Sequence, residues 1–497
     1  MFILEAKYST NLPQVAYSAQ QVKQYEGDAA SRSGTNLSQL MLRAGQALFS
    51  LFDHELVTAQ RVLLLAGKGN NAGDAYVLAK LLHQSGREVC VYAVFSPQQL
   101  LGDARQAYLA AEQSGVKIVI EQPQLQHFCV IVDGVFGTGF KGQLPPALIS
   151  LFGDCKNSQA KCISIDIPSG VNGTSSVVSK GAFVADMTMT FIALKQGMLT
   201  GSAKAVCGQL LFASLDVAEA FNQIVHPSAT FHASNTLLGQ LGQRAVDSYK
   251  NSCGHVLVIG GNKGMAGAVR LAAEAALRSG AGLVSVATHP DSVISVLQGR
   301  YELMVHGINE ADELAVLFKK ADVVVIGPGL GQNDWAKALF EKSLSFGGAV
   351  VVDADALNLL ANSTERYCHS ILTPHHGEAR RLLVENDVID PQSRFELASW
   401  LATNYNATVV LKGPGSLVAN AKRININRSG SSAMASAGMG DVLSGIIGAL
   451  VGQGMESFAA STLAVYIHGL AAQIAAKDGE RGLLASDLFV HIRRLLG

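Results

Sequence analysis

The chain has 497 residues, of which 48% are hydrophobic and 15% are charged, so it is long and apolar enough to form more than one globular domain and is not a disordered protein. Its formal net charge is −1 and no cluster of lysines and arginines stands out, so we expect no nucleic-acid partner. The 50 glycines exceed the usual share of ~7% and suit many tight turns between strands and helices.

The cysteines and the apolar runs indicate a cellular compartment. Seven scattered cysteines without C-x-x-C spacing indicate buried thiols in a reducing compartment, and neither a disulfide framework nor a zinc site. The segment Met1–Lys7 is too short and too charged for a signal peptide, and no apolar run approaches the ~18 residues of a membrane span. We therefore expect a cytoplasmic protein without a membrane partner. The cysteines are Cys90, Cys129, Cys155, Cys162, Cys207, Cys253 and Cys368.

In the first half, short β-branched runs alternate with helical segments, after a separate helix expected over Ser18–Glu26. This alternation predicts βαβ units around a mainly parallel sheet. The expected strands are Arg61–Ala66, Glu88–Phe95, Lys117–Ile120, Phe128–Asp133, Lys161–Asp166 and Met187–Ala193, and the expected helices include Leu37–Phe52, Ala75–Ser85 and Asp103–Ser114.

The same pattern restarts after a polar, turn-rich segment over Phe221–Ser252. The chain is therefore expected to form two doubly wound α/β domains, residues 1–225 and residues 226–497. The strands expected in the second domain are His255–Ile259, Leu283–Ala287, Asp322–Ile326, Ala349–Asp353, Ser370–Leu372 and Thr408–Leu411.

Polar residues follow three expected strands of the first half, where a parallel sheet places its ligands. Asn70, Asn71 and Asp74 belong to the glycine-rich segment after the first strand, and Asp133 and Asp166 end two others. Any one aspartate could instead cap a helix or stabilise a turn, and for a single residue that alternative is favoured. Together they favour a site, because carboxylate, amide and carbonyl oxygens bind hard cations and glycines let phosphate approach the backbone.

Three segments, Asn70–Asp74, Val132–Gly139 and Asp166–Gly170, resemble the NAD(P)H-hydrate epimerase family, which has a Rossmann-like fold. The resemblance implies a K⁺ ion near Asn71, Asp133 and Ser169, and Asp166 as the acid/base at C6 of the hydrated ring. The family usually has glycine where this chain has Ala72 and Ala75. The resemblance also implies substrate contacts at Asn70, Asn71, Ala72, Gly73, Asp74, Gly137, Thr138, Gly139, Phe140, Lys141, Gly142, Gln143 and Asp166.

The second half has its own glycine-rich segments at expected strand ends. Two of them, Gly260–Ala268 and Ile326–Gly331, follow strands, and Val352–Asn358 and Leu372–Glu378 end two more. A fifth segment combines two stretches of the chain, residues 412–416 and Ala437–Asp441. The pair His375-His376 is not expected to share a metal, because adjacent side chains of an extended chain point to opposite sides. Asp441 taken alone is equally a helix N-cap or a base.

A Lys-Gly strand end followed by Gly-x-Gly-Asp resembles the nucleotide site of ribokinase-like folds, and the full set resembles the ADP-dependent NAD(P)H-hydrate dehydratase family. In this resemblance Asp441 deprotonates the C6 hydroxyl, ADP phosphorylates it and phosphate leaves. Mg²⁺ is compatible with such a site. The chain has His376 and Ala437 where the family usually has Pro and Gly. The implied nucleotide contacts are Lys412, Gly413, Pro414, Gly415, Ser416 and Gly440, and the implied hydrate contacts are Ala268, Gly329, Gly331, His375 and Asp441.

The two resemblances together predict a bifunctional metabolite-repair enzyme. It would epimerise the R and S forms of hydrated NADH and NADPH (NADHX and NADPHX) and dehydrate the S form with ADP. We expect a homo-oligomer. The alternative is a small-molecule kinase of the ribokinase superfamily whose first half is a non-catalytic binding module.

Overall fold

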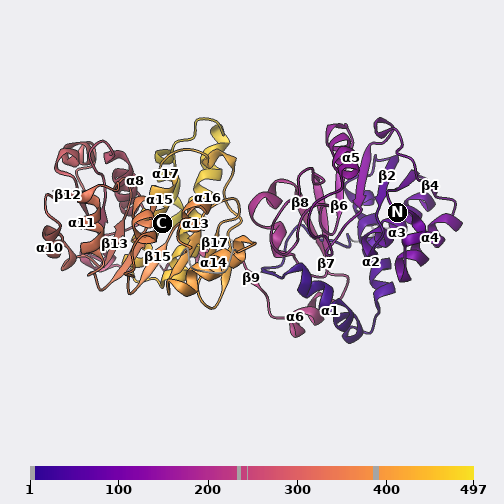
Figure 1. The fold of residues 1–497 in the computed structure, drawn as a ribbon, viewed down its shortest axis with the longest axis horizontal. Coiled ribbons are helices and arrows are strands. Elements are labelled where there is room, and N and C mark those ends of the chain that lie inside the picture. The colour runs from indigo at the N-terminus through magenta and orange to yellow at the C-terminus, as the bar shows by residue number, and fades with distance from the viewer. Residues whose placement is uncertain (1–5, 232–236, 243, 384–390) are drawn as a thin grey trace. The chain divides into compact units, whose positions relative to one another are not determined.

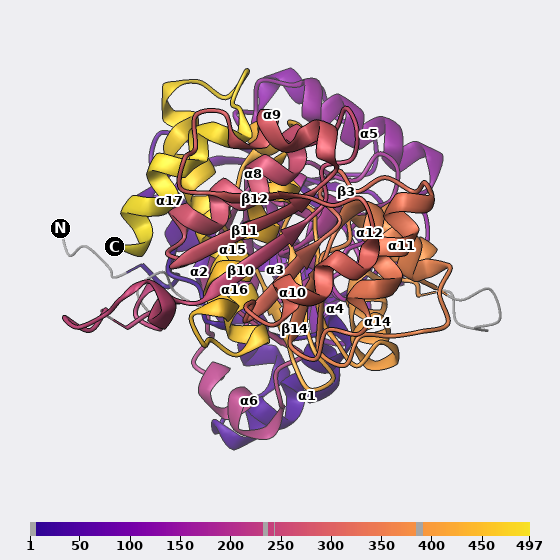
Figure 2. The ribbon, with the colours of Figure 1, turned by 90° about the vertical axis from the view of Figure 1, so that its left-hand side faces the viewer.

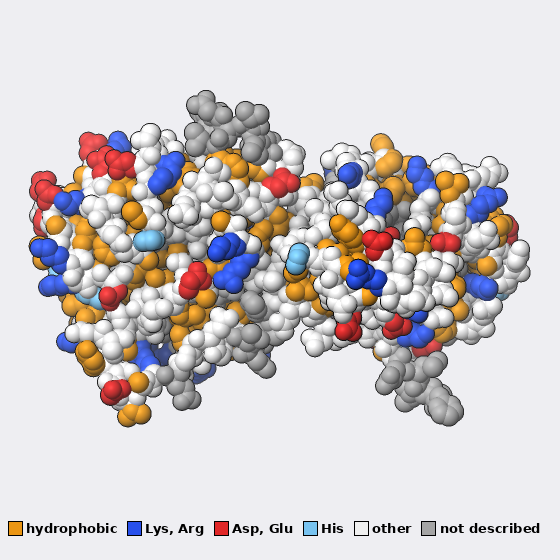
Figure 3. Space-filling view, turned by 90° about the horizontal axis from the view of Figure 1, so that it is seen from below, with side chains coloured by type: hydrophobic (Ala, Val, Ile, Leu, Met, Phe, Trp, Pro, Cys, Tyr) orange, Lys and Arg blue, Asp and Glu red, His pale blue; other side chains and the backbone are white. Residues whose placement is uncertain are grey.

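The computed structural model describes residues 6–231, 237–242, 244–383 and 391–497. The chain divides into two compact units, Met1–Thr230 and Phe231–Gly497, each with its own sheet (Figure 1). The division falls close to the expected position at residue 225. On the face drawn in Figure 3, basic and acidic side chains are interspersed.

The first unit is built on a parallel sheet with the strand order β4-β3-β2-β5-β6-β7-β8. The strands predicted in this unit are confirmed with shifts at their ends, whereas β8 and the short antiparallel pair β1 and β9 were not predicted. The bounds are β1 Val15–Ala16, β2 Arg61–Ala66, β3 Glu88–Ala93, β4 Lys117–Val119, β5 Val130–Gly134, β6 Lys161–Ile165, β7 Met187–Phe191, β8 Gln209–Ala213 and β9 Ala229–Thr230.

Helices cover both faces of this sheet, which explains why its central strands are apolar throughout. Alternate residues of β2 point to opposite faces: Leu64 lies in the core formed with α2 and α3, and Leu63 and Leu65 lie in the core formed with α5. The helices are α1 Ala19–Arg32, α2 Leu37–His54, α3 Asn70–Gln84, α4 Gly102–Gln113, α5 Pro146–Asn157 and α6 Ala218–Ile224.

The second unit contains the strand order β18-β17-β16-β15-β14-β13-β10-β11-β12, parallel except where β17 pairs with its two neighbours. Three of these strands, β12, β17 and β18, were not predicted. The bounds are β10 His255–Ile259, β11 Leu283–Thr288, β12 Met304–Gly307, β13 Val323–Ile326, β14 Ala349–Val352, β15 Ser370–Leu372, β16 Thr408–Leu411, β17 Leu417–Ala419 and β18 Ile424–Ile426.

Helices α8, α15, α16 and α17 cover one face of this sheet, and α11, α12 and α14 lie on the other (Figure 2). Helices α8 and α15 approach closely at Gly445, where a Cβ would stand 2.1 Å from the Ala272 carbonyl oxygen. The bounds are α8 Ala266–Arg278, α9 Val293–Leu297, α10 Leu314–Phe318, α11 Asp334–Ser343, α12 Ala354–Ala361, α13 His376–Arg381, α14 Arg394–Asn404, α15 Met439–Gly452, α16 Ser457–Ala475 and α17 Leu488–Leu496.

Two compositional expectations need correction. Cys368 is exposed and Cys129 is partly exposed, so the thiols are not all buried. The segment Ser457–Asp478, which contains α16, is long and apolar enough to cross a membrane by length and composition. However, 72% of the apolar 18-residue stretch in this segment is buried inside the second unit, and this burial accounts for its apolar character.

Candidate functional site

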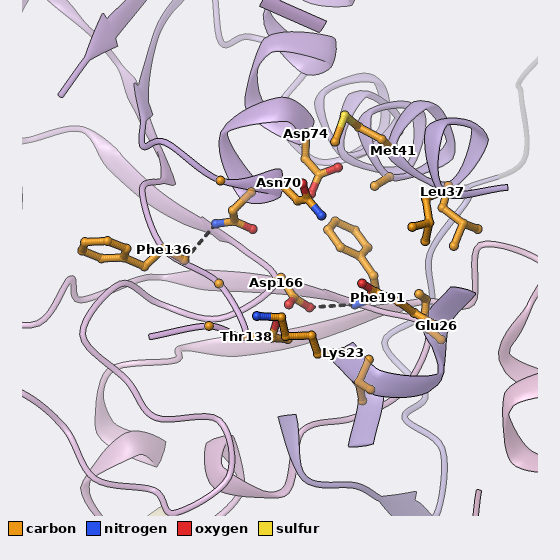
Figure 4. A pocket seen from close by; sticks show the side chains of 18 of the residues that line it. Lys23, Glu26, Leu37, Met41, Asn70, Asp74, Phe136, Thr138, Asp166 and Phe191 are labelled. Atoms are coloured by element: carbon orange, nitrogen blue, oxygen red, sulfur yellow. Dashed lines mark hydrogen bonds between the residues drawn. The ribbon is translucent and has the colours of Figure 1, made fainter. Parts of the chain in front are cut away.

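A cavity of about 550 Å³ opens in the first unit beyond the carboxyl ends of β2, β5, β6 and β7 (Figure 4). Helices α1, α2 and α3 supply the rest of its wall. Predicted residues that line it are Asn70, Asn71, Asp74, Gly137, Thr138, Gly139, Phe140 and Asp166, and residues that were not predicted include Lys23, Glu26, Leu37, Met41, Lys68, Phe136, Phe191 and Lys195.

Asp166 follows β6 directly and has the left-handed backbone conformation, with φ of 63°. Its Oδ1 accepts a 2.5 Å hydrogen bond from the Lys195 ammonium, which is 1% exposed, and others from Thr190 Oγ1 at 3.1 Å and Phe191 N at 3.3 Å. Lys195 also donates to the Phe191 carbonyl at 2.8 Å. The lysine therefore fixes Asp166 as a buried ion pair at the floor of the cavity.

Two more carboxyl groups lie around this pair. Asp74 projects from α3 and Glu26 from α1, and both line the cavity. Burial, and then the charge of Asp166, raises the pKa of Glu26 to about 7 and that of Asp74 well above its usual range. The cavity therefore contains an ion-paired carboxylate beside two carboxyl groups that hold their protons more tightly than usual.

Asn71, Asp133 and Ser169 meet beside this cavity. Ser169 Oγ donates to Asp133 Oδ1 at 2.6 Å and accepts from Phe136 N at 2.8 Å, while Asn71 Nδ2 donates to the carbonyls of Phe136 and Ile165. Burial raises the pKa of Asp133 to about 6, although hydrogen bonds from Ser169, Val135 and Ser164 oppose this shift. The donor set contains carboxylate, amide, hydroxyl and carbonyl oxygens, which suits K⁺.

The segment Asn70–Asp74, read from the sequence as a loop before a helix, forms the first turns of α3 itself, whose N-cap is Gly69. Asp74 is therefore not a cap. Ala72 and Gly73 face the core, not the cavity, and neither Ala72 nor Ala75 has a positive φ, so their methyl groups cause no backbone strain. Lys141, Gly142 and Gln143 are exposed, and Gln143 accepts a hydrogen bond from Ser179.

The second unit gathers polar and charged residues at the carboxyl ends of the adjacent parallel strands β14, β15 and β16. Asp353 follows β14 and is 1% exposed; its Oδ1 accepts from Lys412 Nζ at 2.8 Å and its Oδ2 from Ser444 Oγ at 2.5 Å. Burial would raise the pKa of Asp353, but the charge and hydrogen bond of Lys412 outweigh it and lower the pKa. Asp353 and Ser444 were not among the predicted site residues.

The N-terminus of α15 lies over this lysine. Gly438 is the N-cap in the left-handed conformation, with φ of 84°, and a Cβ on Gly440 would stand 3.2 Å from Lys412 Nζ. Asp441 is the third residue of the helix, so it is not the N-cap. Burial, and then the charge of Asp353, raises the pKa of Asp441 to about 7, which suits a general base at neutral pH.

The predicted hydrate contacts form a second group at the same edge of the sheet. A Cβ on Gly329 (φ 59°) would meet Ala268 Cβ at 3.2 Å, and Gly331 N donates to Asp355 at 2.8 Å. His375 is the N-cap of α13, and its Nδ1 accepts a hydrogen bond from Gly377 N at 2.9 Å.

The predicted nucleotide segment, residues 412–416, forms the tight turn between β16 and β17. Gly413 has φ of 141°, and a Cβ there would stand 3.0 Å from the Arg394 guanidinium. Ser416 Oγ donates to the Gly413 carbonyl at 3.0 Å. The positive φ favours glycine at this position, and a side chain there would have to displace the Arg394 guanidinium.

Comparison with known proteins gives matches for both units. Residues 256–494 match the family described as NAD(P)H-hydrate dehydratase, and residues 37–197 match the family described as YjeF-related protein N-terminus. A ribokinase-like superfamily protein of Enterococcus faecalis V583 has a TM-score of 0.50 and 27% identity, covering 55% of this chain and 97% of that one. A hypothetical protein of Streptococcus mutans also has a TM-score of 0.50, with 28% identity, covering 54% of this chain and 100% of its own.

Similar curated proteins extend over the whole chain. The bifunctional NAD(P)H-hydrate repair enzyme of Coxiella burnetii is 43% identical over 485 residues, which cover 97% of this chain and 99% of that protein. The protein of the same name in Escherichia coli is 40% identical over 496 residues, covering 99% and 95%. The second unit thus has a ribokinase-like fold, and the chain belongs to the family of bifunctional NAD(P)H-hydrate repair enzymes.

Proposed function

We propose that the first unit interconverts the R and S hydrates of NADH and NADPH, and that the second unit dehydrates the S form with ADP, giving AMP, phosphate and NAD(P)H. The observation that carries this proposal is the placement of Asp441, whose pKa is raised to about 7, beside Lys412 and the N-terminus of α15. The full-length similarity to repair enzymes supports it over the kinase alternative.

In the second unit, Asp441 would remove the proton of the C6 hydroxyl, and the resulting oxygen would attack the terminal phosphorus of ADP, releasing AMP. Lys412 and the backbone N–H groups around Gly440 would stabilise the charge on the transferred phosphoryl group. Phosphate then leaves C6 with its bonding electrons, the ring nitrogen supplies its lone pair, and loss of a C5 proton restores the dihydronicotinamide. The hydrate would contact Ala268, Gly329, Gly331 and His375.

In the first unit, Asp166 would act as acid/base at C6 of the ring, with Lys195 holding its position. The rest of the substrate would lie along Asn70–Asp74 and Gly137–Gln143. Asn71, Asp133 and Ser169 would hold K⁺, which would order the two loops that border the cavity. Their all-oxygen donor set supports this assignment.

Among the described residues no group of three or more His, Cys, Asp or Glu side chains is arranged to hold a metal ion. Mg²⁺ would enter the second unit with ADP and neutralise charge on its phosphate groups. The homo-oligomeric state and the cytoplasmic location stay predictions from the sequence, and light scattering would test the first.

The test is to incubate the protein with a racemic hydrate, ADP and K⁺ and to follow dihydronicotinamide absorbance and free phosphate. Complete conversion with one phosphate per NAD(P)H is expected. Asp166→Asn should stop the reaction near half conversion, and Asp441→Asn should abolish it. A stable phosphorylated product without NAD(P)H would contradict the proposal and favour a kinase.

A further inference from the structure

Asp74 and Asp166 enter the cavity of the first unit from different structural elements. Asp74 projects from α3 and Asp166 from the end of β6 (Figure 4). Within the described part of the chain the Asp74 carboxyl makes no hydrogen bond, whereas Asp166 Oδ1 receives three. Asp74 is therefore a carboxyl group that the fold places in the cavity without using it structurally.

The two carboxyl groups differ in charge because their surroundings differ. Lys195 forms an ion pair with Asp166. Asp74 faces Asp166 and Glu26, whose negative charges add to burial in raising its pKa, while Lys195 opposes them. Lys23 on α1 lowers the pKa of Glu26, which also faces Asp166 and Lys195. The cavity therefore offers an ion-paired carboxylate, Asp166, and a second carboxyl group, Asp74, that holds its proton more tightly than usual.

Inverting C6 of the hydrate requires this combination. C6 carries a hydroxyl group and is bonded to the ring nitrogen, whose lone pair can expel a protonated hydroxyl as water. A proton donor is needed for the oxygen that leaves, and a proton acceptor is needed for the water that adds to the other face. One carboxyl group cannot serve both faces at the same time.

We propose that Asp74 is the second catalytic residue of the epimerase, acting as the acid for the leaving oxygen while Asp166 is the base for the entering water. This inference rests on the proposed epimerase function. Asp74 gives its proton to the C6 hydroxyl, the C6–O bond breaks, water leaves, and the lone pair of the nitrogen forms a C6=N double bond. Asp166 takes a proton from a second water, whose oxygen bonds to C6 from the opposite face, and the C6=N electrons return to nitrogen.

After one inversion the proton lies on Asp166, so the same pair is poised for the reverse inversion with the roles exchanged. Proton exchange with solvent then returns the proton to Asp74 and leaves Asp166 ionised. The step therefore replaces the C6 oxygen by an oxygen from solvent in every inversion, whereas opening and reclosing the ring would keep the original oxygen.

The test uses the full-length protein and purified R hydrate in ¹⁸O-labelled water, without ADP so that the second unit is idle. We expect one ¹⁸O in each S molecule formed above the spontaneous rate. Asp74→Asn should lower kcat for epimerisation by about 100-fold with little change in KM. The matched control is Asp28→Asn, which removes an exposed carboxylate of α1 and should match wild type.

An S product that keeps its ¹⁶O, or an Asp74→Asn variant with wild-type kcat, would overturn the inference. The labelling experiment needs no variant, so it decides even if the substitution harms folding. We expect no such harm: asparagine is nearly isosteric with a protonated aspartate and adds no charge to the cavity, so the melting temperature should stay equal or rise. A wild-type protein without any epimerisation would instead overturn the proposed function of the first unit and this inference with it.

Discussion

Ser444 donates a 2.5 Å hydrogen bond to Asp353, which ties helix α15 to the carboxyl end of strand β14. The second oxygen of the same carboxylate holds Lys412 at 2.8 Å. One buried aspartate thus fixes both the lysine and the helix N-terminus that would surround the transferred phosphoryl group. It also places a permanent negative charge near Asp441.

This charge leads to a pH prediction. Because the pKa of Asp441 is raised to about 7, the proposed base is protonated below pH 7. Dehydratase kcat/KM on the S hydrate should therefore fall about tenfold per pH unit below 7 and level off above it. Initial-rate measurements from pH 5.5 to 9 would show this limb, and a flat profile would contradict the assignment.

The raised pKa of Asp441 also predicts how the stability of the folded protein depends on pH. A carboxyl whose pKa is raised by folding stabilises the folded state at low pH, and this contribution is lost as the pH rises through about 7. Asp441→Asn should therefore raise the melting temperature at pH 8 and change it little at pH 4. The control is Asp334→Asn, which removes an exposed carboxylate and should give no such difference. An equal or lower melting temperature for Asp441→Asn at pH 8 would count against the raised pKa.

Two neighbouring glycines should respond differently to alanine. A methyl group on Gly440 would press on Lys412, so Gly440→Ala should raise KM for ADP about tenfold while the protein stays folded. Gly438→Ala places alanine at φ of 84° and should cost about 1–2 kcal/mol of stability. Gly454→Ala, at φ of 90° with nothing within 4 Å of the added carbon, isolates the backbone cost. Equal ADP KM in Gly440→Ala and wild type would refute the nucleotide assignment.

Removing the lysine of the buried ion pair should affect the first unit alone. Lys195→Met leaves Asp166 buried without its cation, so urea denaturation should show a loss of about 3–5 kcal/mol, and epimerisation should fall at least 100-fold. Dehydration of pure S hydrate should continue. Lys180→Ala, which removes an exposed lysine, is the control. Full epimerase activity in Lys195→Met would show that Asp166 acts without its partner.

The cation can be tested by exchange. Replacing K⁺ by Na⁺ should slow epimerisation, because Na⁺ is smaller and holds its hydration water more tightly, and should leave the second unit's activity unchanged. Asn71→Ala should remove the difference between the two salts. An epimerase that is equally fast in both would rule out the site at Asn71, Asp133 and Ser169.

The apolar strands could be predicted because their burial on both faces gives continuous hydrophobic runs, as in Arg61–Ala66. Strands β17 and β18 pair antiparallel and have only three residues each, and so short a run gives no clear alternation in the sequence. The start of α3 was predicted too late, at Ala75 instead of Asn70, because the glycines before it suggested a loop. Gly73 lies inside α3, and its missing side chain lets the helix pack closely against Met41 and Ala104.

Asp166 and Asp441 were proposed from their positions next to strands and helices, and the structure brings each into a polar cluster. Of the residues in these clusters, Lys412 was predicted as a nucleotide contact, whereas Lys195 and Asp353 were not among the predicted site residues. Lys195 lies 29 residues from Asp166 and Lys412 lies 59 residues from Asp353, so only the order of strands in the sheet reveals these pairs. Lys195 follows the predicted strand Met187–Ala193 by two residues, and this position is the one local signal that could have found it.

The left-handed conformation of Asp166 limits which amino acids evolution or an engineer can place there. Only glycine, asparagine and aspartate adopt φ near 63° readily, and of these aspartate alone carries a charge. A glutamate, although chemically similar, would strain the backbone at the end of β6. The backbone geometry thus restricts the position of the proposed acid/base to small side chains before any substrate is bound, so single substitutions can place few other charged groups there.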